Sequence, residues 1–125
     1  MRNVFVYYEC NYGELADDCG ACCNIRVFSD KKKVRSQVAK TLKIYAGTGI
    51  DEPRYAGCDR FVVDKDDLDN AGVIVNEDDR LTDEQIDILV ENEFKNESCC
   101  ITLFANEQEN GDEYFTIHVD EMAVE

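Results

Sequence analysis

The feature that most constrains the fold is a set of short runs rich in β-branched and aromatic residues. The first run, VFVYY at residues 4–8, is apolar at every position, which is typical of a strand buried on both faces. CCITLF and YFTIHV flank a polar connection near the C-terminus and predict a hairpin. The strands expected from these runs cover residues 4–8, 24–28, 61–63, 73–75, 99–104 and 114–119.

Two other stretches carry apolar residues at helical spacing. Ser29 or Asp30 can cap a first helix that ends at Gly47. In the second, Thr82 and Gln85 form the capping box T-D-E-Q, in which each side chain satisfies a backbone donor of the other, worth ~1 kcal/mol for the cap. The apolar stripes of the two helices are Val34, Val38, Leu42 and Tyr45, then Ile86, Leu89, Val90 and Phe94.

The order of these elements, ββα, a less regular middle and αββ, predicts an α+β fold. A chain of 125 residues with 44% hydrophobic residues is expected to form one domain, residues 1–125, with a real hydrophobic core. We expect a mainly antiparallel sheet with two helices packed on it.

The cysteines and the N-terminus indicate a cytoplasmic protein. Seven cysteines is an odd number and two pairs are adjacent in sequence, Cys22-Cys23 and Cys99-Cys100, so reduced thiols are expected rather than a disulfide framework. The apolar run at residues 4–8 is too short for a signal peptide or a membrane span.

The charge is unevenly distributed along the chain. The net charge is −15, yet residues 1–50 hold eight Lys/Arg against five Asp/Glu, whereas residues 51–125 hold five against twenty-three. The first helix is rich in lysine, and the second carries Asp83, Asp87 and Glu91 at four-residue steps, about 6 Å of rise each. Such an acidic face repels nucleic acid and membranes and attracts basic proteins. A solvated face that favours solubility is the simpler interpretation.

The segment CNYGELADDCGACCN (residues 10–24) raises the question of a metal site. Cys19-Gly-Ala-Cys22 is half of a zinc knuckle, and Cys10 or Cys23, with Cys58, could complete a tetrahedral set. No second C-x-x-C occurs in the chain. We therefore expect thiols without a cofactor, and keep zinc on Cys10, Cys19, Cys22 and Cys58 as the alternative.

Residues 67–78 approach the calcium-binding EF-hand pattern. Asp67, Asp69 and Gly72 are in register, but Ala71 and Asp78 depart from it. A turn followed by a strand is the preferred interpretation.

The loop at residues 47–60 offers a second kind of site. Tyr55 could stack on a base while Arg54 and Arg60 bind phosphate, so a small-molecule- or nucleotide-binding or sequestering homodimer is the alternative function. The simpler interpretation is a surface loop whose arginines pair with carboxylates.

The sequence contains no recognisable catalytic motif. His118 is the single histidine, in the run YFTIHV, where it shares a strand face with Tyr114 and Thr116. We therefore expect no enzymatic activity.

The layout of residues 2–46, a VFVYY strand, a polar loop, RVFSD and a lysine-rich helix, resembles that of small accessory proteins of phages and mobile elements. Very acidic single domains in that group resemble anti-CRISPR and other anti-defence inhibitors, which occupy the nucleic-acid groove of their target. The resemblance implies an inhibitor, and it assigns no residue a role because no family motif is matched.

The leading hypothesis is thus an acidic inhibitor that binds a basic, nucleic-acid-handling defence protein by mimicry. It would bind neither nucleic acid nor membranes directly. A homo-oligomer is also plausible, because the basic helix could meet the acidic half of another copy. The expected contact residues are Asp64, Asp66, Asp67, Asp69, Glu77, Asp78, Asp79, Asp83, Glu84, Asp87 and Glu91.

Overall fold

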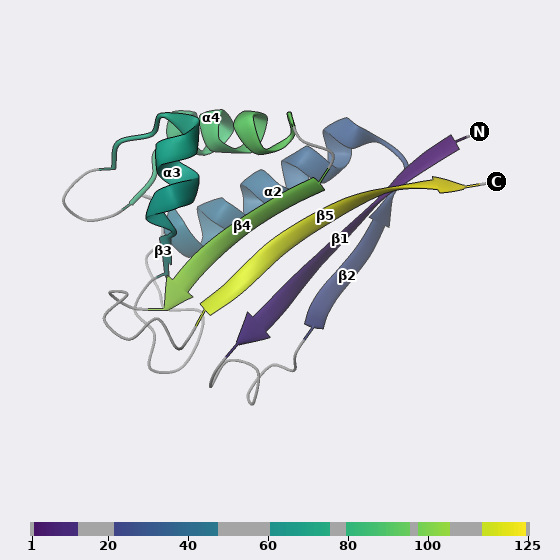
Figure 1. Cartoon of the computed structure of the whole chain (residues 1–125), viewed down its shortest axis with the longest axis horizontal. Coiled ribbons are helices and arrows are strands. Elements are labelled where there is room, and N and C mark those ends of the chain that lie inside the picture. The colour runs from purple at the N-terminus through teal and green to yellow at the C-terminus, as the bar shows by residue number, and fades with distance from the viewer. Residues whose placement is uncertain are drawn as a thin grey trace.

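The computed structural model describes residues 2–12, 22–47, 61–75, 80–95, 98–105 and 114–124. Within these ranges a five-stranded sheet is combined with helices (Figure 1). The elements are β1 (Arg2–Tyr12), β2 (Cys22–Phe28), α2 (Lys31–Ala46), β3 (Phe61–Val63), α3 (Lys65–Ala71), α4 (Asp83–Glu93), β4 (Ser98–Ala105) and β5 (Tyr114–Val124).

The strand order is β2-β1-β5-β4-β3, and every neighbouring pair is antiparallel. The predicted α+β class with a mainly antiparallel sheet is therefore confirmed. The prediction of two helices in a ββα…αββ order is not matched, because α3 is a further helix in the middle of the chain. β4 and β5 form the predicted C-terminal hairpin pair, and β5 extends beyond the expected end at Val119.

The covered face of the sheet forms the core. Along β1 the side chains of Phe5 and Tyr7 are buried and alternate with partly exposed neighbours, as expected for a strand with one covered face. This corrects the expectation that residues 4–8 are buried on both faces. Phe61 and Phe115 meet edge to face with ring centroids 5.1 Å apart, and Tyr45 from α2 packs against both rings.

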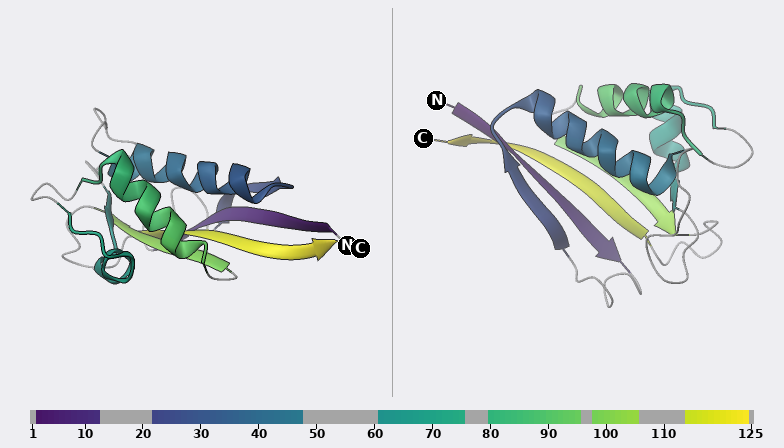
Figure 2. Two further views of the ribbon diagram at one scale, coloured as in Figure 1. Left: turned by 90° about the horizontal axis from the view of Figure 1, so that it is seen from above. Right: turned by 180° about the vertical axis from the view of Figure 1, so that it is seen from behind.

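α2 lies across this covered face. Asp30 caps it by accepting a hydrogen bond from the Lys32 N–H, and its buried stripe includes Val34, Val38 and Leu42, as predicted. Seen from behind the view of Figure 1, α2 lies in front of the strands (Figure 2). α4 packs beside α2 and against β4.

Residues 65–75 differ most from the sequence prediction. Lys65–Ala71 is helical and Val73–Val75 is not a strand, so the expected turn and strand are wrong. Gly72 ends the helix with a positive φ of 73°, a left-handed cap that glycine adopts without a steric cost. Because Asp67 and Asp69 lie within this helix, they do not form an EF-hand loop.

The opposite face of the strands β1, β2 and β5 carries none of the described helices, whereas α3 lies at the β3–β4 edge of the sheet (Figures 1 and 2). None of the helices in the described part of the chain is both long and apolar enough to cross a membrane. We call the side chains that the paired strands direct to this side the open face; Thr116 alone among them is buried. They are Val4, Val6, Tyr8, Cys10, Tyr12, Cys22, Ile25, Val27, Cys100, Thr102, Phe104, Tyr114, Thr116, His118, Asp120 and Met122.

Candidate functional site

α4 presents the densest row of carboxylates among the described residues. The predicted capping box is confirmed: Thr82 accepts from the Gln85 N–H at 3.2 Å, and Gln85 Oε1 accepts from the Thr82 N–H at 2.9 Å. Its apolar stripe turns inward, which leaves Asp83, Glu84, Asp87 and Glu91 exposed. The cap and the buried stripe therefore fix the direction in which these carboxylates point.

α3 supplies the second row. Asp66 and Asp69 are exposed, whereas Asp64 and Asp67 are half-buried. The Leu68 side chain enters the core and anchors the helix, which packs against α4. The exposed carboxylates of these neighbouring helices form what we call the acidic surface: Asp66, Asp69, Asp83, Glu84, Asp87 and Glu91.

Asp67 has a structural role that the sequence did not indicate. Its Oδ2 accepts a 3.0 Å hydrogen bond from the Thr102 N–H, on the edge of β4 just beyond its pairing with β3. The carboxylate thus satisfies a donor that the short strand β3 leaves unpaired. Asp67 therefore points into the fold and is a weak candidate for partner contact.

Two half-buried carboxyl groups, one on α3 and one at the end of α4, have raised pKa values. Burial, and secondarily the negative charges of Asp64 and Asp66, raise the pKa of Asp67 to about 6 even though the Thr102 N–H favours the charged form. Burial and the neighbouring Asp67 raise the pKa of Glu93 to about 7. Ionisation of the two groups is mutually unfavourable because like charges repel at short range.

α2, the lysine-rich helix, lies directly beside part of the acidic surface. The Leu81 N–H donates to the Ala46 carbonyl oxygen at 2.9 Å, so the end of α2 adjoins the start of α4 and the helices run in opposite directions. The basic start of α2 therefore lies beside the end of α4, where a groove of about 680 Å³ separates them. Its lining is Asp30, Lys31, Lys32, Arg35, Ser36, Ala39, Asp87, Val90 and Glu91.

This arrangement divides the acidic surface into two parts. Asp87 and Glu91 share the groove with Lys31, Lys32 and Arg35, so their field is partly compensated within the molecule. Arg35 is held there with its guanidinium 5.8 Å from the centre of the Phe94 ring. The remaining carboxylates, Asp66, Asp69, Asp83 and Glu84, do not line the groove.

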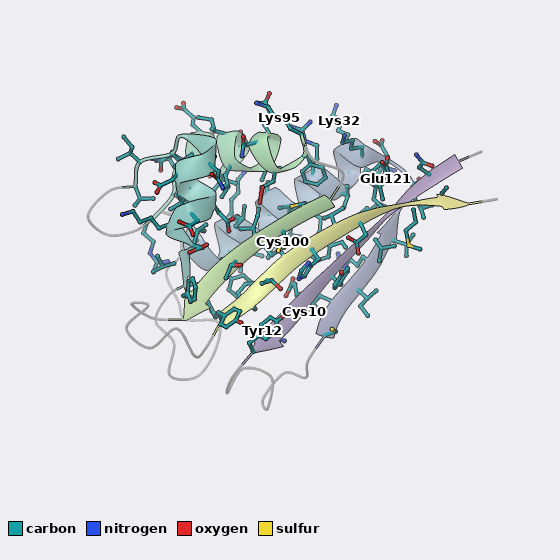
Figure 3. All side chains as sticks on the ribbon, viewed as in Figure 1. Cys10, Tyr12, Lys32, Lys95, Cys100 and Glu121 are labelled. Carbon is teal, nitrogen blue, oxygen red and sulfur yellow. The ribbon has the colours of Figure 1, made fainter. Side chains whose placement is uncertain are left out.

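The open face carries a row of aromatic contacts across the strands. Tyr8 stacks on His118 with ring centroids 4.8 Å apart, and Tyr12 stacks on Tyr114 at 4.5 Å. Tyr114 also meets Phe104 at 5.5 Å. Figure 3 shows Tyr12 together with Cys10 and Cys100 on this side of the sheet. The surface is thus rich in apolar and aromatic side chains, which come together through strand register and not through any local sequence pattern.

The single histidine lies on the open face, on the strand side predicted for it. His118 Nε2 is 2.6 Å from Thr116 Oγ1, and burial lowers the pKa of the imidazole although Asp120 opposes this. Cys100 is its partner across the strands. Burial and the nearby carboxylates raise the pKa of the Cys100 thiol, so this environment does not activate it as a nucleophile.

A buried polar cluster lies on the other side of β1. Glu9 is only 4% exposed; its Oε2 accepts from the Tyr7 hydroxyl at 2.6 Å and its Oε1 from Asn24 Nδ2 at 3.0 Å. Asn24 occupies a left-handed backbone position, φ 55°, where a bulge interrupts the pairing of β1 with β2. The cluster holds the edge strand in place, and its Asn24 end is exposed.

Several predicted site residues lie outside the described residues. Of the proposed zinc set, Cys10 and Cys22 are brought together, with their sulfur atoms 3.3 Å apart. Within the described ranges no group of three or more metal-ligating side chains is assembled. The predicted residues whose structure is not described are Cys19, Arg54, Tyr55, Cys58, Arg60, Glu77, Asp78 and Asp79.

No protein-family model, no curated protein and no solved structure matches this chain. The function is therefore inferred from the chemistry of the described residues.

Proposed function

We propose that the chain is an acidic interaction protein whose acidic surface binds a basic, nucleic-acid-handling partner in place of nucleic acid. The observation that supports this most is the exposure of six carboxylates on the two neighbouring helices α3 and α4. A cationic groove built for phosphates attracts such a surface at long range and contacts it without any reaction.

The spacing on α4 supports mimicry of a phosphate backbone. Asp83, Asp87 and Glu91 follow one another at about 6 Å of rise per step. Phosphates along one strand of duplex DNA advance about 3.4 Å each, so one carboxylate would replace every second phosphate. The helix is rigidly capped, so little conformational entropy would be lost on binding.

The groove beside α2 refines this proposal. Because Asp87 and Glu91 face lysine and arginine side chains of the same molecule, we expect Asp66, Asp69, Asp83 and Glu84 to dominate attraction of a partner. A partner that engages Asp87 or Glu91 must compete with α2. The contact surface is therefore narrower than the full set of carboxylates predicted from the sequence.

Affinity capture at low salt from lysate of the native host tests the proposal. The native chain and a triple variant, Asp66→Lys, Asp69→Lys and Asp83→Lys, are used as parallel baits after nuclease treatment. Proteins held by the native bait alone should be basic nucleic-acid-binding proteins, and the chain should displace labelled DNA from them. Equal capture by both baits, or failure to displace DNA, would contradict the proposal.

The open face favours a second candidate function, self-association of two copies. Four of the large hydrophobic side chains that are well exposed lie on it: Tyr12, Ile25, Val27 and Met122. Among the open-face residues the only carboxylate is Asp120, which accepts a 2.9 Å hydrogen bond from the Tyr8 hydroxyl. A basic partner therefore finds little to recognise here, whereas an identical apolar face is complementary to it.

The charge distribution is compatible with such a dimer. Sheets that pack face to face are ~10 Å apart, and a helix layer adds about 10 Å on each side. The helix layers of the two copies would be about 30 Å apart, several times the ~8 Å screening length at physiological salt. The carboxylates of α4 would then remain on the outside of the dimer and accessible to a partner.

A further inference from the structure

The thiols of Cys10 and Cys22 are hydrogen-bonded to each other, with their sulfur atoms 3.3 Å apart, and no disulfide joins them. The two residues are direct partners across the antiparallel pair formed by β1 and β2. Both side chains are on the open face, where Cys10 is partly exposed and Cys22 is exposed. Figure 3 shows Cys10 near the end of β1.

The backbone already has the geometry that a disulfide requires. Directly opposed residues of antiparallel strands have Cα atoms about 4.5–5.5 Å apart, within the range of about 4.4–6.8 Å seen across disulfides. The sulfur atoms need to approach by only about 1.2 Å, from 3.3 Å to a bond length of about 2.05 Å. The strand pairing therefore already holds the two thiols close together, so little further conformational entropy is lost when the bond forms.

Cys99 and Cys100, the other two cysteines whose side chains the structure describes, lack this arrangement. Cys99 and Cys100 are neighbours along β4, so their side chains point to opposite faces of the sheet. Cys99 is buried, and burial raises the pKa of its thiol. The Cys100 side chain is exposed, but partial burial of its thiol, and secondarily the nearby carboxylates, raise the pKa of that thiol as well. Neither is prepared to react as a pair.

We propose that Cys10 and Cys22 are a redox modification site. They form a reversible intramolecular disulfide by thiol–disulfide exchange with a small-molecule disulfide such as oxidised glutathione. The thiolate of one cysteine attacks a sulfur of glutathione disulfide and expels one glutathione thiolate, giving a mixed disulfide. The second cysteine attacks the protein sulfur of that mixed disulfide and expels the other glutathione. The two protein thiols are thereby oxidised and the glutathione disulfide is reduced. The two protons of the protein thiols pass to the two glutathione thiolates.

The bond would change the edge of the sheet. β2 is an edge strand, and the disulfide would link it covalently to β1 and close a loop whose ends are twelve positions apart. Closing such a loop restricts the unfolded chain, so we expect the melting temperature to rise by about 5 °C on oxidation. The edge, and Val27 on the open face beside it, would be fixed more firmly in the oxidised protein.

The proposal is tested by equilibrating the full chain in glutathione buffers of graded ratio, quenching with an alkylating agent and mapping peptides by mass spectrometry. The expected product is a peptide pair linked through Cys10 and Cys22 that is lost on reduction. Cys10→Ser and Cys22→Ser should each abolish it and leave a glutathione adduct on the remaining cysteine. Cys100→Ser, an exposed cysteine on the same face, should leave the linked pair unchanged.

Other outcomes would overturn the proposal. These are a dominant disulfide that omits Cys10 or Cys22, glutathione adducts without an internal bond, or a bound metal ion that protects both thiols from oxidation. Melting temperatures of the serine variants before and after oxidation provide a second readout. A rise that persists in both variants would show that the stabilisation has another origin.

Discussion

The hydroxyl of Tyr7 donates a 2.6 Å hydrogen bond to the buried carboxylate of Glu9, two residues along the same strand and on the same face. The same hydroxyl lies 2.7 Å from Thr41 Oγ1 on α2, so it connects the sheet to the helix that covers it. Burial, together with the hydrogen bond to Glu9, raises the pKa of the phenol far above its usual range, and the group stays protonated as a donor.

Removing this hydroxyl should be costly. Tyr7→Phe deprives a buried carboxylate oxygen of its donor, and we expect the free energy of unfolding to fall by about 2 kcal/mol. Tyr8→Phe is the matched control, because Tyr8 bonds Asp120 on the partly solvated open face and should cost less than about 1 kcal/mol. Urea denaturation of both variants measures the difference. Equal losses in the free energy of unfolding would show that the buried Tyr7 hydroxyl stabilises the fold no more than the partly solvated Tyr8 hydroxyl does.

The capping box gives a prediction about α4. Thr82→Ala removes the side-chain acceptor of the Gln85 N–H and should lower stability by about 1 kcal/mol. Thr82→Ser keeps the acceptor and should be close to the native protein. Thermal denaturation followed by circular dichroism compares the two, and an alanine variant as stable as the serine variant would contradict the assigned cap.

The raised pKa values predict how stability depends on pH. Asp67 and Glu93 hold protons more tightly in the folded than in the unfolded state, so their stabilisation is complete below about pH 4 and is lost as the pH rises through about 6 and 7. Both groups are half-exposed and screened by solvent, so we expect a loss of about 1 kcal/mol between pH 5 and pH 8.

Asp67→Asn separates this effect from general charge repulsion. An amide oxygen can still accept from the Thr102 N–H but does not ionise, so the variant should lose less stability than the native protein between pH 5 and pH 8. Asp69→Asn changes an exposed carboxylate of the same helix and should leave the slope of stability against pH nearly native. Chemical denaturation at a series of pH values distinguishes them, and identical slopes for the two variants would contradict the assignment.

Self-association through the open face is tested by sedimentation. Val27→Glu puts a charge on the apolar face and should shift a dimer to monomer, with a loss of at least about tenfold in association constant. Ile74→Glu alters an exposed hydrophobic residue elsewhere and should leave the dimer intact. A native chain that stays monomeric at high concentration, or a dimer that tolerates Val27→Glu, would rule out this interface.

The parts of the fold predicted best are those encoded by local patterns. The T-D-E-Q box fixed the start of α4 because a cap involves residues only three positions apart. The helix at Lys65–Ala71 was missed because Asp67, Asp69 and Asn70 are poor helix formers. Its stability comes instead from Leu68 in the core and from the hydrogen bond to Thr102, which are contacts with distant parts of the chain.

The candidate site shows the same limit. The exposed carboxylates of α4 followed from its apolar stripe, but the approach of Lys31 and Arg35 to Glu91 depends on how α2 and α4 pack, which no local pattern encodes. The contact of Cys10 with Cys22 depends on strand register. Strict alternation back from Val27 would place Cys23, not Cys22, on the face of Cys10. The bulge at Asn24 shifts the pairing of β2 with β1 and brings Cys22 opposite Cys10 instead.

The central claim is that the carboxylates outside the groove form a surface that a cationic partner recognises. The most direct measurement is the association constant of the chain with the captured partner at several salt concentrations, for the native protein, Asp83→Lys and Glu121→Lys. Both variants change the net charge equally, and both positions are exposed, but Glu121 lies on β5 outside the acidic surface. We expect an affinity that falls steeply with salt and a loss of about tenfold or more for Asp83→Lys, with a much smaller loss for Glu121→Lys. Equal effects of the two reversals, or an affinity indifferent to salt, would contradict it.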